Sequence, residues 1–229
     1  MISTVPHSPK DLEKIAATYS IPTLPELIKT FLYHQSNPNV PADDIVDISQ
    51  LPPFHRNIHV FNSATCIYRT PRNTDGTCGT VHQVIHCTKS WKKGPPRYDC
   101  VFVNNGTNLP GFEGLWVGQV LLIFSIKSPR GSRVPNIPCA LVQWFTQVDD
   151  DPCDLTGMWM VKPEINPATK QRAMSVIHLE SILQPAHLIP IYGEEHVHHD
   201  IQAADSLNAF KGFYVNKFSD YHAYQALTI

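Results

Sequence analysis

The sequence predicts a mainly β protein, α+β overall, whose core is a small antiparallel β-barrel of about seven strands with helices at both ends. Seven short runs rich in β-branched and aromatic residues carry this prediction: 57–69, 80–87, 98–104, 115–127, 138–148, 157–163 and 173–182. Loops rich in Gly, Pro, Asn and Asp separate the runs. Most of these loops are shorter than the dozen or so residues that a parallel crossover needs, so we expect neighbouring strands to be antiparallel.

Prolines and changes of pattern divide the 229 residues into three parts. Residues 1–55 are predicted to hold two helices and a proline-rich linker outside the core, residues 56–192 the β-barrel, and residues 193–229 a C-terminal helix that packs on or beside the barrel. We find no internal repeat and no low-complexity tract, which favours one barrel with helical additions.

Two helices are expected before the barrel. Residues 9–18 have Ser8 as a possible N-cap and a proline near the start. Residues 23–35 begin with Thr23 as a plausible cap and have Pro25 in the first turn. Apolar residues recur in this second segment at helical spacing, which supports the prediction of a helix.

One further helix is expected in the C-terminal part, from about residue 204 onward. Asp205 or Ser206 would cap it. Its aromatic stripe consists of Leu207, Phe210, Tyr214 and Phe218. Such a stripe predicts packing against the barrel, or docking of a protein partner.

The composition indicates an intracellular protein with reduced thiols. Six cysteines are spread thinly, without a Cys-x-x-Cys pair, and the first residues show no apolar signal region. The most apolar run, 115–126, is shorter than the ~20 residues of a membrane helix, so no membrane partner is expected. The net charge of −2 excludes a uniformly basic surface but leaves room for a local basic patch.

The charges predict such a patch. If the strands form a meander, every second loop lies at the same end of the barrel. One end would then gather ten of the 18 basic residues, including Lys162. The nine predicted to bind nucleic acid are Lys89, Lys92, Lys93, Arg97, Lys127, Arg130, Arg133, Lys170 and Arg172. The opposite end would carry Glu113, Asp149, Asp150, Asp151 and Asp154. The alternative is that charges occupy loops only because loops are solvated.

Acidic residues do not predict a catalytic metal site. Three consecutive aspartates, 149–151, cannot all face one ion, and the proline and glycine that follow mark a turn. Asp99 and Glu164 are the two further acids that a nuclease-like metal site would need. Asp99, however, is expected at the start of its strand instead of its middle, and Glu164 is not expected on a helix, so the set does not match such a site. We therefore interpret residues 149–157 as a connection between strands.

Histidines and cysteines are also weak metal candidates. Cys78, His82, His86 and Cys87 are the right types for zinc. On a strand, however, His82 and His86 lie about 13 Å apart. The acids and histidines of 194–200 lack a standard catalytic spacing. No nucleophile elbow, phosphate loop or dinucleotide motif is present, so we predict no catalytic residue, no metal and no small-molecule cofactor, and whether the protein is an enzyme stays open.

Aromatic residues leave a further possibility open. Trp116, Trp144, Trp159 and Phe145 could line an aromatic cage for a methylated lysine. The alternative is that these aromatic side chains are buried in the core of the barrel.

Several segments, in order, resemble a known group of proteins. They are RYDCVFVN, GLWVGQVLLIFSI, PCALVQWF, DLTGMWMVKPE, SVIHLESILQPAHLIPIYG and DSLNAFKGFYVNKFSDYHAY. Together they resemble the C-terminal region of transposon-encoded proteins of mushroom-forming fungi, the Plavaka and Kyakuja-Dileera-Zisupton group related to CACTA elements, over roughly residues 19–225. The resemblance implies a fungal, element-derived origin and a nuclear, DNA-linked setting. It carries over no functional residue, since the family's catalytic domain and zinc clusters lie upstream.

The order of the strand runs is also similar to bromo-adjacent-homology (BAH) modules of chromatin proteins, which are small SH3-like barrels. This similarity concerns the fold. The leading hypothesis is a non-catalytic, transposable-element-derived domain that binds DNA or chromatin through the basic end of its barrel. The alternatives are a protein–protein module that uses the C-terminal helix, and an orphan protein known only by its genomic neighbourhood. A metal-dependent enzyme is the least favoured.

Overall fold

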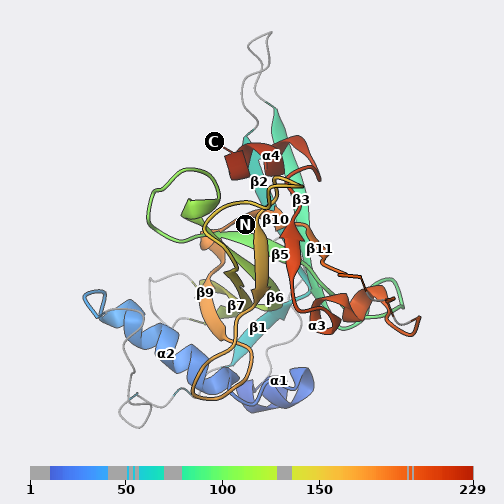
Figure 1. Ribbon diagram of the computed structural model, residues 1–229. Helices are drawn as coiled ribbons and strands as arrows, with labels where there is room; N and C mark the ends of the chain where they lie inside the picture. The colour runs from blue at the N-terminus through green and yellow to red at the C-terminus, as the bar shows by residue number, and fades with distance from the viewer. Residues whose placement is uncertain are drawn as a thin grey trace.

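The structure is a computed structural model that describes residues 11–40, 51, 54, 57–69, 79–127, 136–194, 196–197 and 199–228. It confirms the predicted fold class. Nine antiparallel strands form one sheet, in which seven follow the order β10-β5-β6-β7-β8-β12-β11 and curve into a nearly closed barrel (Figure 1). A smaller sheet has the order β2-β3-β4.

The strands are β1 Ile58–Phe61, β2 Ser63–Arg69, β3 Thr80–Thr88, β4 Arg97–Tyr98, β5 Cys100–Asn104, β6 Leu115–Ile126, β7 Ile137–Gln147, β8 Met160–Pro163, β9 Met174–His178, β10 Ile182–Ala186, β11 Leu188–Pro190 and β12 Phe213–Val215. The α-helices are α1 Leu12–Tyr19, α2 Leu24–Ser36, α3 Ser206–Ala209 and α4 Tyr221–Thr228, and the short 3-10 helices are η2 Gly111–Gly114, η3 Leu179–Ser181 and η4 Ala203–Asp205. No helix in the described part of the chain is long and apolar enough to span a bilayer.

Strands β6 and β7 form the centre of the sheet. Residues 115–119 of β6 pair with β5, residues 123–126 pair with β1, and residues 117–126 pair with β7. The register shifts between Val120 and Leu122, where a bulge bends the pair. Most residues of β6 and residues 139–142 of β7 are buried, as expected for strand segments covered on both faces.

Strand β7 has two successive partners on its other edge. Residues 145–147 pair with β8 and residues 139–143 with β9. Residues 164–173 therefore leave the sheet between two segments that both pair with β7. This arrangement differs from the expected meander, in which each run pairs only with the next.

Helices α1 and α2 are part of the core. Asp11 caps α1 by accepting a hydrogen bond from the backbone of Glu13, at 3.4 Å. Leu24 and Ile28 of α2 are fully buried, in one cluster with residues of β6, β7 and β9. The expectation that these helices lie outside the core is therefore wrong. The predicted cap of the first helix, Ser8, lies outside the described residues.

The C-terminal part is not one helix. Helix α3 ends at Ala209, and β12 then joins β8 and β11 in the sheet. Phe213 and Val215 are fully buried, and the Phe213 ring lies 5.6 Å from that of Phe145. Burial of alternate residues in the sheet outweighs the helical spacing that the sequence suggested. A separate helix, α4, follows and lies at the opposite end of the molecule from α1 (Figure 1).

Candidate nucleic-acid interface

The basic residues that the structure describes do not share one end of the barrel, contrary to what the sequence predicted. Lys127 directly follows β6, where Ile126 pairs with Ile137. Arg172 instead donates to the carbonyl of Trp144, seven residues further along β7, at 3.2 Å. At ~3.3 Å per residue these two positions are separated by about 23 Å along the strand. The error arises because residues 164–173 leave from the middle of β7 rather than from an end of the barrel.

Arg172 is committed to the fold. Its guanidinium carbon lies 4.8 Å from the centre of the Phe145 ring, and the side chain is partly buried. This burial lowers the pKa of Arg172 from its ordinary value, while interaction with the Cys100 and Glu164 side chains opposes the shift. Arg172 therefore packs on the barrel instead of projecting toward a ligand. Arg130 and Arg133 lie outside the described residues.

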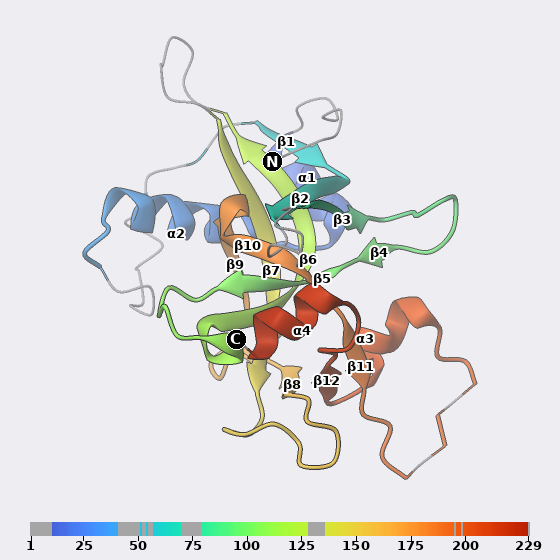
Figure 2. The same cartoon turned by 90° about the horizontal axis from the view of Figure 1, so that it is seen from above.

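Four of the predicted cations do come together in one hairpin. Lys89, Lys92, Lys93 and Arg97 all belong to residues 89–97, which contain no acidic residue and connect the end of β3 to β4. The hairpin leaves the barrel near the middle of β6, because the backbone of Val120 donates to Asp99 at 3.0 Å. In Figure 2 it projects from the side of the barrel.

The tip of this hairpin has an unusual backbone. Lys92 and Lys93 have φ values of 50° and 65°, and Gly94 donates from its backbone to Trp91 at 2.8 Å. Positive φ at both central positions is typical of a type I′ turn, which favours Asn-Gly over lysine. A residue with a Cβ is destabilised by roughly 1–2 kcal/mol in this region. The tip therefore exposes two adjacent lysines in a strained turn.

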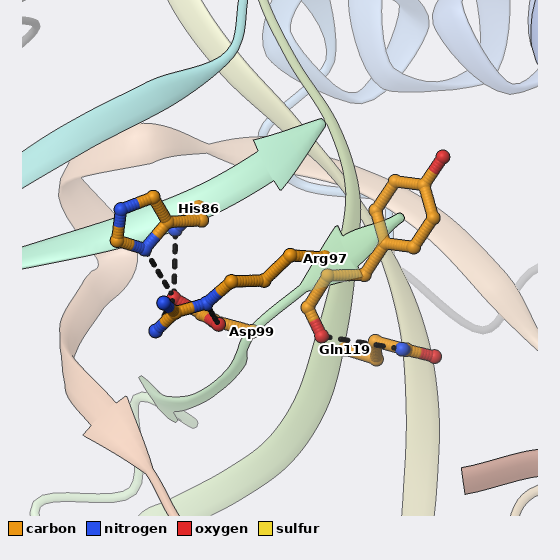
Figure 3. Close-up of polar contacts among 5 residues, drawn as sticks. His86, Arg97, Asp99 and Gln119 are labelled. Atoms are coloured by element: carbon orange, nitrogen blue, oxygen red, sulfur yellow. Dashed lines mark hydrogen bonds and ion pairs between the residues drawn. The ribbon is translucent and has the colours of Figure 1, made fainter. Parts of the chain in front are cut away.

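Asp99 organises the base of the hairpin (Figure 3). Its Oδ1 accepts from Nε of Arg97 at 2.8 Å, and its Oδ2 accepts from the backbone N–H of His86 at 2.8 Å. Nδ1 of His86 lies 2.9 Å from the same Oδ2, so in the neutral ring Nδ1 carries the proton and donates it. The Asp99 side chain is only 16% exposed, which strengthens these charge-assisted bonds.

The Trp91 ring contacts one histidine and two cations of the hairpin. The His86 ring is 4.1 Å from it, centre to centre, at 67°. The guanidinium of Arg97 lies 5.1 Å from the Trp91 ring centre and the ammonium of Lys92 lies 5.6 Å from it. Both cations are thus held near one aromatic ring by cation–π attraction. Asp99 and Trp91 together fix Arg97, whose side chain is still 43% exposed.

The hairpin is anchored to the core. The amide of Gln119, on β6, donates to the carbonyl of Tyr98 at 3.3 Å (Figure 3). Lys89 places its ammonium 4.9 Å from the Tyr19 ring of α1. Cys87, at the end of β3, is fully buried. These contacts give the charged tip a rigid base.

The triple aspartate lies in the connection between β7 and β8, as predicted. The carbonyl of Asp149 accepts from the side chain of Gln147, and Gly157 turns the chain with a φ of 62°. Among the described residues, no three His, Cys, Asp or Glu side chains come close enough to hold a metal ion. Cys78, Glu195 and His198, members of the two weak metal sets, lie outside that part of the chain.

Sequence reasoning missed the role of Asp99. The signal was present, since an acid two residues after a hairpin arginine can bond to it across one face of a strand. The geometry defines a small antiparallel barrel with a cationic hairpin on a rigid base. No protein-family model and no curated protein matches the chain. The similarities to transposon-encoded proteins and to BAH modules therefore stay predictions.

Proposed function

We propose that this protein is a non-catalytic DNA-binding domain that contacts phosphates through the β3–β4 hairpin, residues 89–97. One observation carries the proposal: two adjacent lysines occupy a turn that disfavours them, next to an arginine aligned by Asp99 and Trp91. Strained backbone is retained where surrounding structure enforces it, and it clusters at binding sites. Interleaved basic and aromatic residues are typical of nucleic-acid surfaces.

The charge distribution supports a local contact. Asp99 compensates one of the four hairpin cations, so the hairpin has a clear positive excess in a protein of net charge −2. A single projecting hairpin suits backbone contacts, which position a protein on DNA without reading its sequence. We accordingly propose a nuclear location and an origin in a transposable element, in line with the resemblance described above.

The test is the salt dependence of affinity for a random DNA duplex, between about 50 and 200 mM salt. Removing both tip lysines, in Lys92→Ala/Lys93→Ala, should reduce the slope of log affinity against log salt by about 2. Affinity should fall by a similar factor for all duplex sequences. A slope near zero for the unmodified protein would refute DNA binding.

Lys170→Ala is the matched control. Lys170 also has a positive φ, 58°, and is exposed, but it lies in the β8–β9 connection. The hairpin proposal predicts unchanged DNA affinity for this variant. An equal loss for Lys170→Ala and for the tip variants would favour a wider basic surface.

A protein–protein module is the second candidate function. Phe218, Tyr221 and Tyr224, at and before α4, are 63%, 65% and 46% exposed. Exposed aromatic groups of this kind favour a protein contact. Light scattering of the purified protein tests self-association through this patch, which Tyr221→Ser/Tyr224→Ser should reduce. If the protein stays a monomer at high concentration, self-association through this patch is excluded.

A further inference from the structure

A second feature of the barrel lies away from the hairpin. A cleft with a volume of about 740 Å³ lies between α2 and the strands β6, β7 and β9. Its volume is in the range of sites that bind small ligands or side chains. Its lining is mostly apolar, with two tryptophans, Trp116 and Trp144, on the barrel side.

The two indoles form a corner. Their ring centres are 5.7 Å apart and their planes meet at 71°. Trp144 is held in place because its Nε1 donates to the hydroxyl of Ser175 on β9 at 2.8 Å. Trp116 is 52% exposed, so its ring is open to a ligand.

Gly118 makes this corner possible. It lies opposite Trp144 on the neighbouring strand, and two residues from Trp116 on the same face. A Cβ at this glycine would overlap Cγ1 of Val142 and would lie 3.1 Å from Cε3 of Trp144. The missing side chain therefore leaves the space that the Trp144 indole occupies.

The charge at the corner favours a cation. Glu164 lines the cleft, and its backbone N–H donates to the carbonyl of Trp144 at 3.1 Å. None of the described residues that line the cleft is a lysine or an arginine. Arg172 interacts electrostatically with Glu164, and its guanidinium lies over Phe145, a lining residue next to Trp144, so the charge of Glu164 is partly balanced there. Two indole rings and one carboxylate in the lining of the same cleft match the requirements of an alkylated ammonium group.

The shape of the cleft favours a peptide as the carrier of that group. Four consecutive residues of β9, Met174 to Ile177, line the cleft. Because successive side chains point to opposite faces, a cleft that touches all four runs along the edge of the strand. In the described part of the chain β9 pairs only with β7, so its other edge has no strand partner there and is the edge at which a peptide strand would add.

A polar group without a partner lies in the same cleft. Both ring nitrogens of His34, on α2, are buried and find no hydrogen-bond partner among the described residues. An unpaired buried polar group is destabilising, and a bound peptide group could supply the missing bond.

We propose that this cleft binds a methylated lysine side chain of an extended peptide, with the ammonium group in the Trp116–Trp144–Glu164 corner. Methylation spreads the charge and weakens hydration, so the aromatic corner should favour the methylated form over unmodified lysine. The peptide backbone on either side follows the edge of β9. This site is independent of the hairpin, and either proposal can fail without the other.

The first experiment is an NMR titration that follows the indole N–H signals of the tryptophans. The probes are the peptide acetyl-Ala-Ala-trimethyllysine-Ala-Ala-amide, its unmodified lysine form, acetyl-trimethyllysine-amide and choline. The trimethyllysine peptide should shift the Trp116 and Trp144 signals and bind about tenfold or more tightly than the lysine peptide. Equal affinity of these two peptides, or no shift of either signal, would overturn the proposal.

The remaining probes test the occupant. If the edge of β9 pairs with the backbone, the peptide should bind several-fold more tightly than acetyl-trimethyllysine-amide. Choline binding as tightly as the peptide would show that the cleft takes a free quaternary amine, and would overturn the peptide assignment.

Variants locate the site. Trp116→Ala should weaken binding of the trimethyllysine peptide roughly two- to thirtyfold, and Glu164→Gln about two- to fivefold. Tyr192→Ala, which removes an aromatic ring of equal exposure, 52%, outside the cleft, is the control and should leave the affinity unchanged. Binding that survives both cleft variants, in proteins whose folding is verified by their thermal transitions, would refute the assignment.

Discussion

The double substitution Lys92→Asn/Lys93→Gly separates the stability of the hairpin from its function. It converts the Lys-Lys tip into Asn-Gly, the pair that a type I′ turn favours. The turn itself should be kept, because both new residues accept the positive φ values of 50° and 65°. We expect the variant to be more stable than the natural sequence and to bind DNA more weakly.

The size of the stability gain follows from the backbone. Left-handed φ destabilises each lysine by roughly 1–2 kcal/mol, and Asn tolerates it better. Glycine loses more freedom on folding, which removes about 0.5–1 kcal/mol of the gain. A net increase of about 1 kcal/mol in the free energy of unfolding should raise Tm by about 2–4 °C in a domain of this size.

Urea unfolding followed by tryptophan fluorescence measures the first effect, and the salt-dependent duplex titration measures the second. Lys92→Gln/Lys93→Gln is the control for charge alone, since it removes the same two cations but keeps a side chain at both positions of positive φ. A variant less stable than the natural protein would refute the strained-turn reasoning. Increased stability with unchanged DNA affinity would refute the hairpin interface alone.

Three further predictions concern the barrel. Gly118→Ala should lower the free energy of unfolding by about 1–3 kcal/mol, because its Cβ crowds Val142 and Trp144, and an unchanged urea midpoint would contradict this. Burial raises the pKa of the Cys100 and Cys139 thiols to about 12 from 9.0. Between these pKa values the folded state keeps protons that the unfolded chain releases. The stability that these thiols contribute should therefore be fully present below pH 9 and fall as pH rises toward 12. Equal urea midpoints at about pH 8 and about pH 10.5 would contradict this prediction. Hydrogen bonds, chiefly from Thr156, lower the pKa of Cys153, so mass spectrometry should find it alkylated by iodoacetamide before the two buried thiols.

The sequence pattern was sufficient to predict most of the strands, because each of these strands has its own run of β-branched and aromatic residues between turn residues. The exceptions depend on long-range contacts. The segment 57–69 divides at Asn62 into strands of two different sheets, and β10 pairs with β5, some 80 residues earlier in the chain. Neither pairing leaves a local signal.

The candidate sites were less predictable than the strands. The hairpin cations followed from sequence, but the separation of Lys127 from Arg172 depends on both β8 and β9 pairing with β7. Trp116 and Trp144 were recognised as cage candidates, whereas Trp159 instead stacks on Phe112, at 4.9 Å between ring centres. Which aromatic rings meet depends on strand register, and a shift of one residue would reverse every face.

Lysine footprinting tests the DNA interface most directly. The protein is treated with an amine-reactive reagent in the presence and absence of a DNA duplex, and the modified lysines are quantified by mass spectrometry. The hairpin interface predicts that DNA protects Lys89, Lys92 and Lys93, while the reactivity of Lys127 and Lys170 is unchanged. Protection of Lys127 or Lys170 equal to that of the hairpin, or no protection of the hairpin lysines under conditions where DNA is bound, would contradict it.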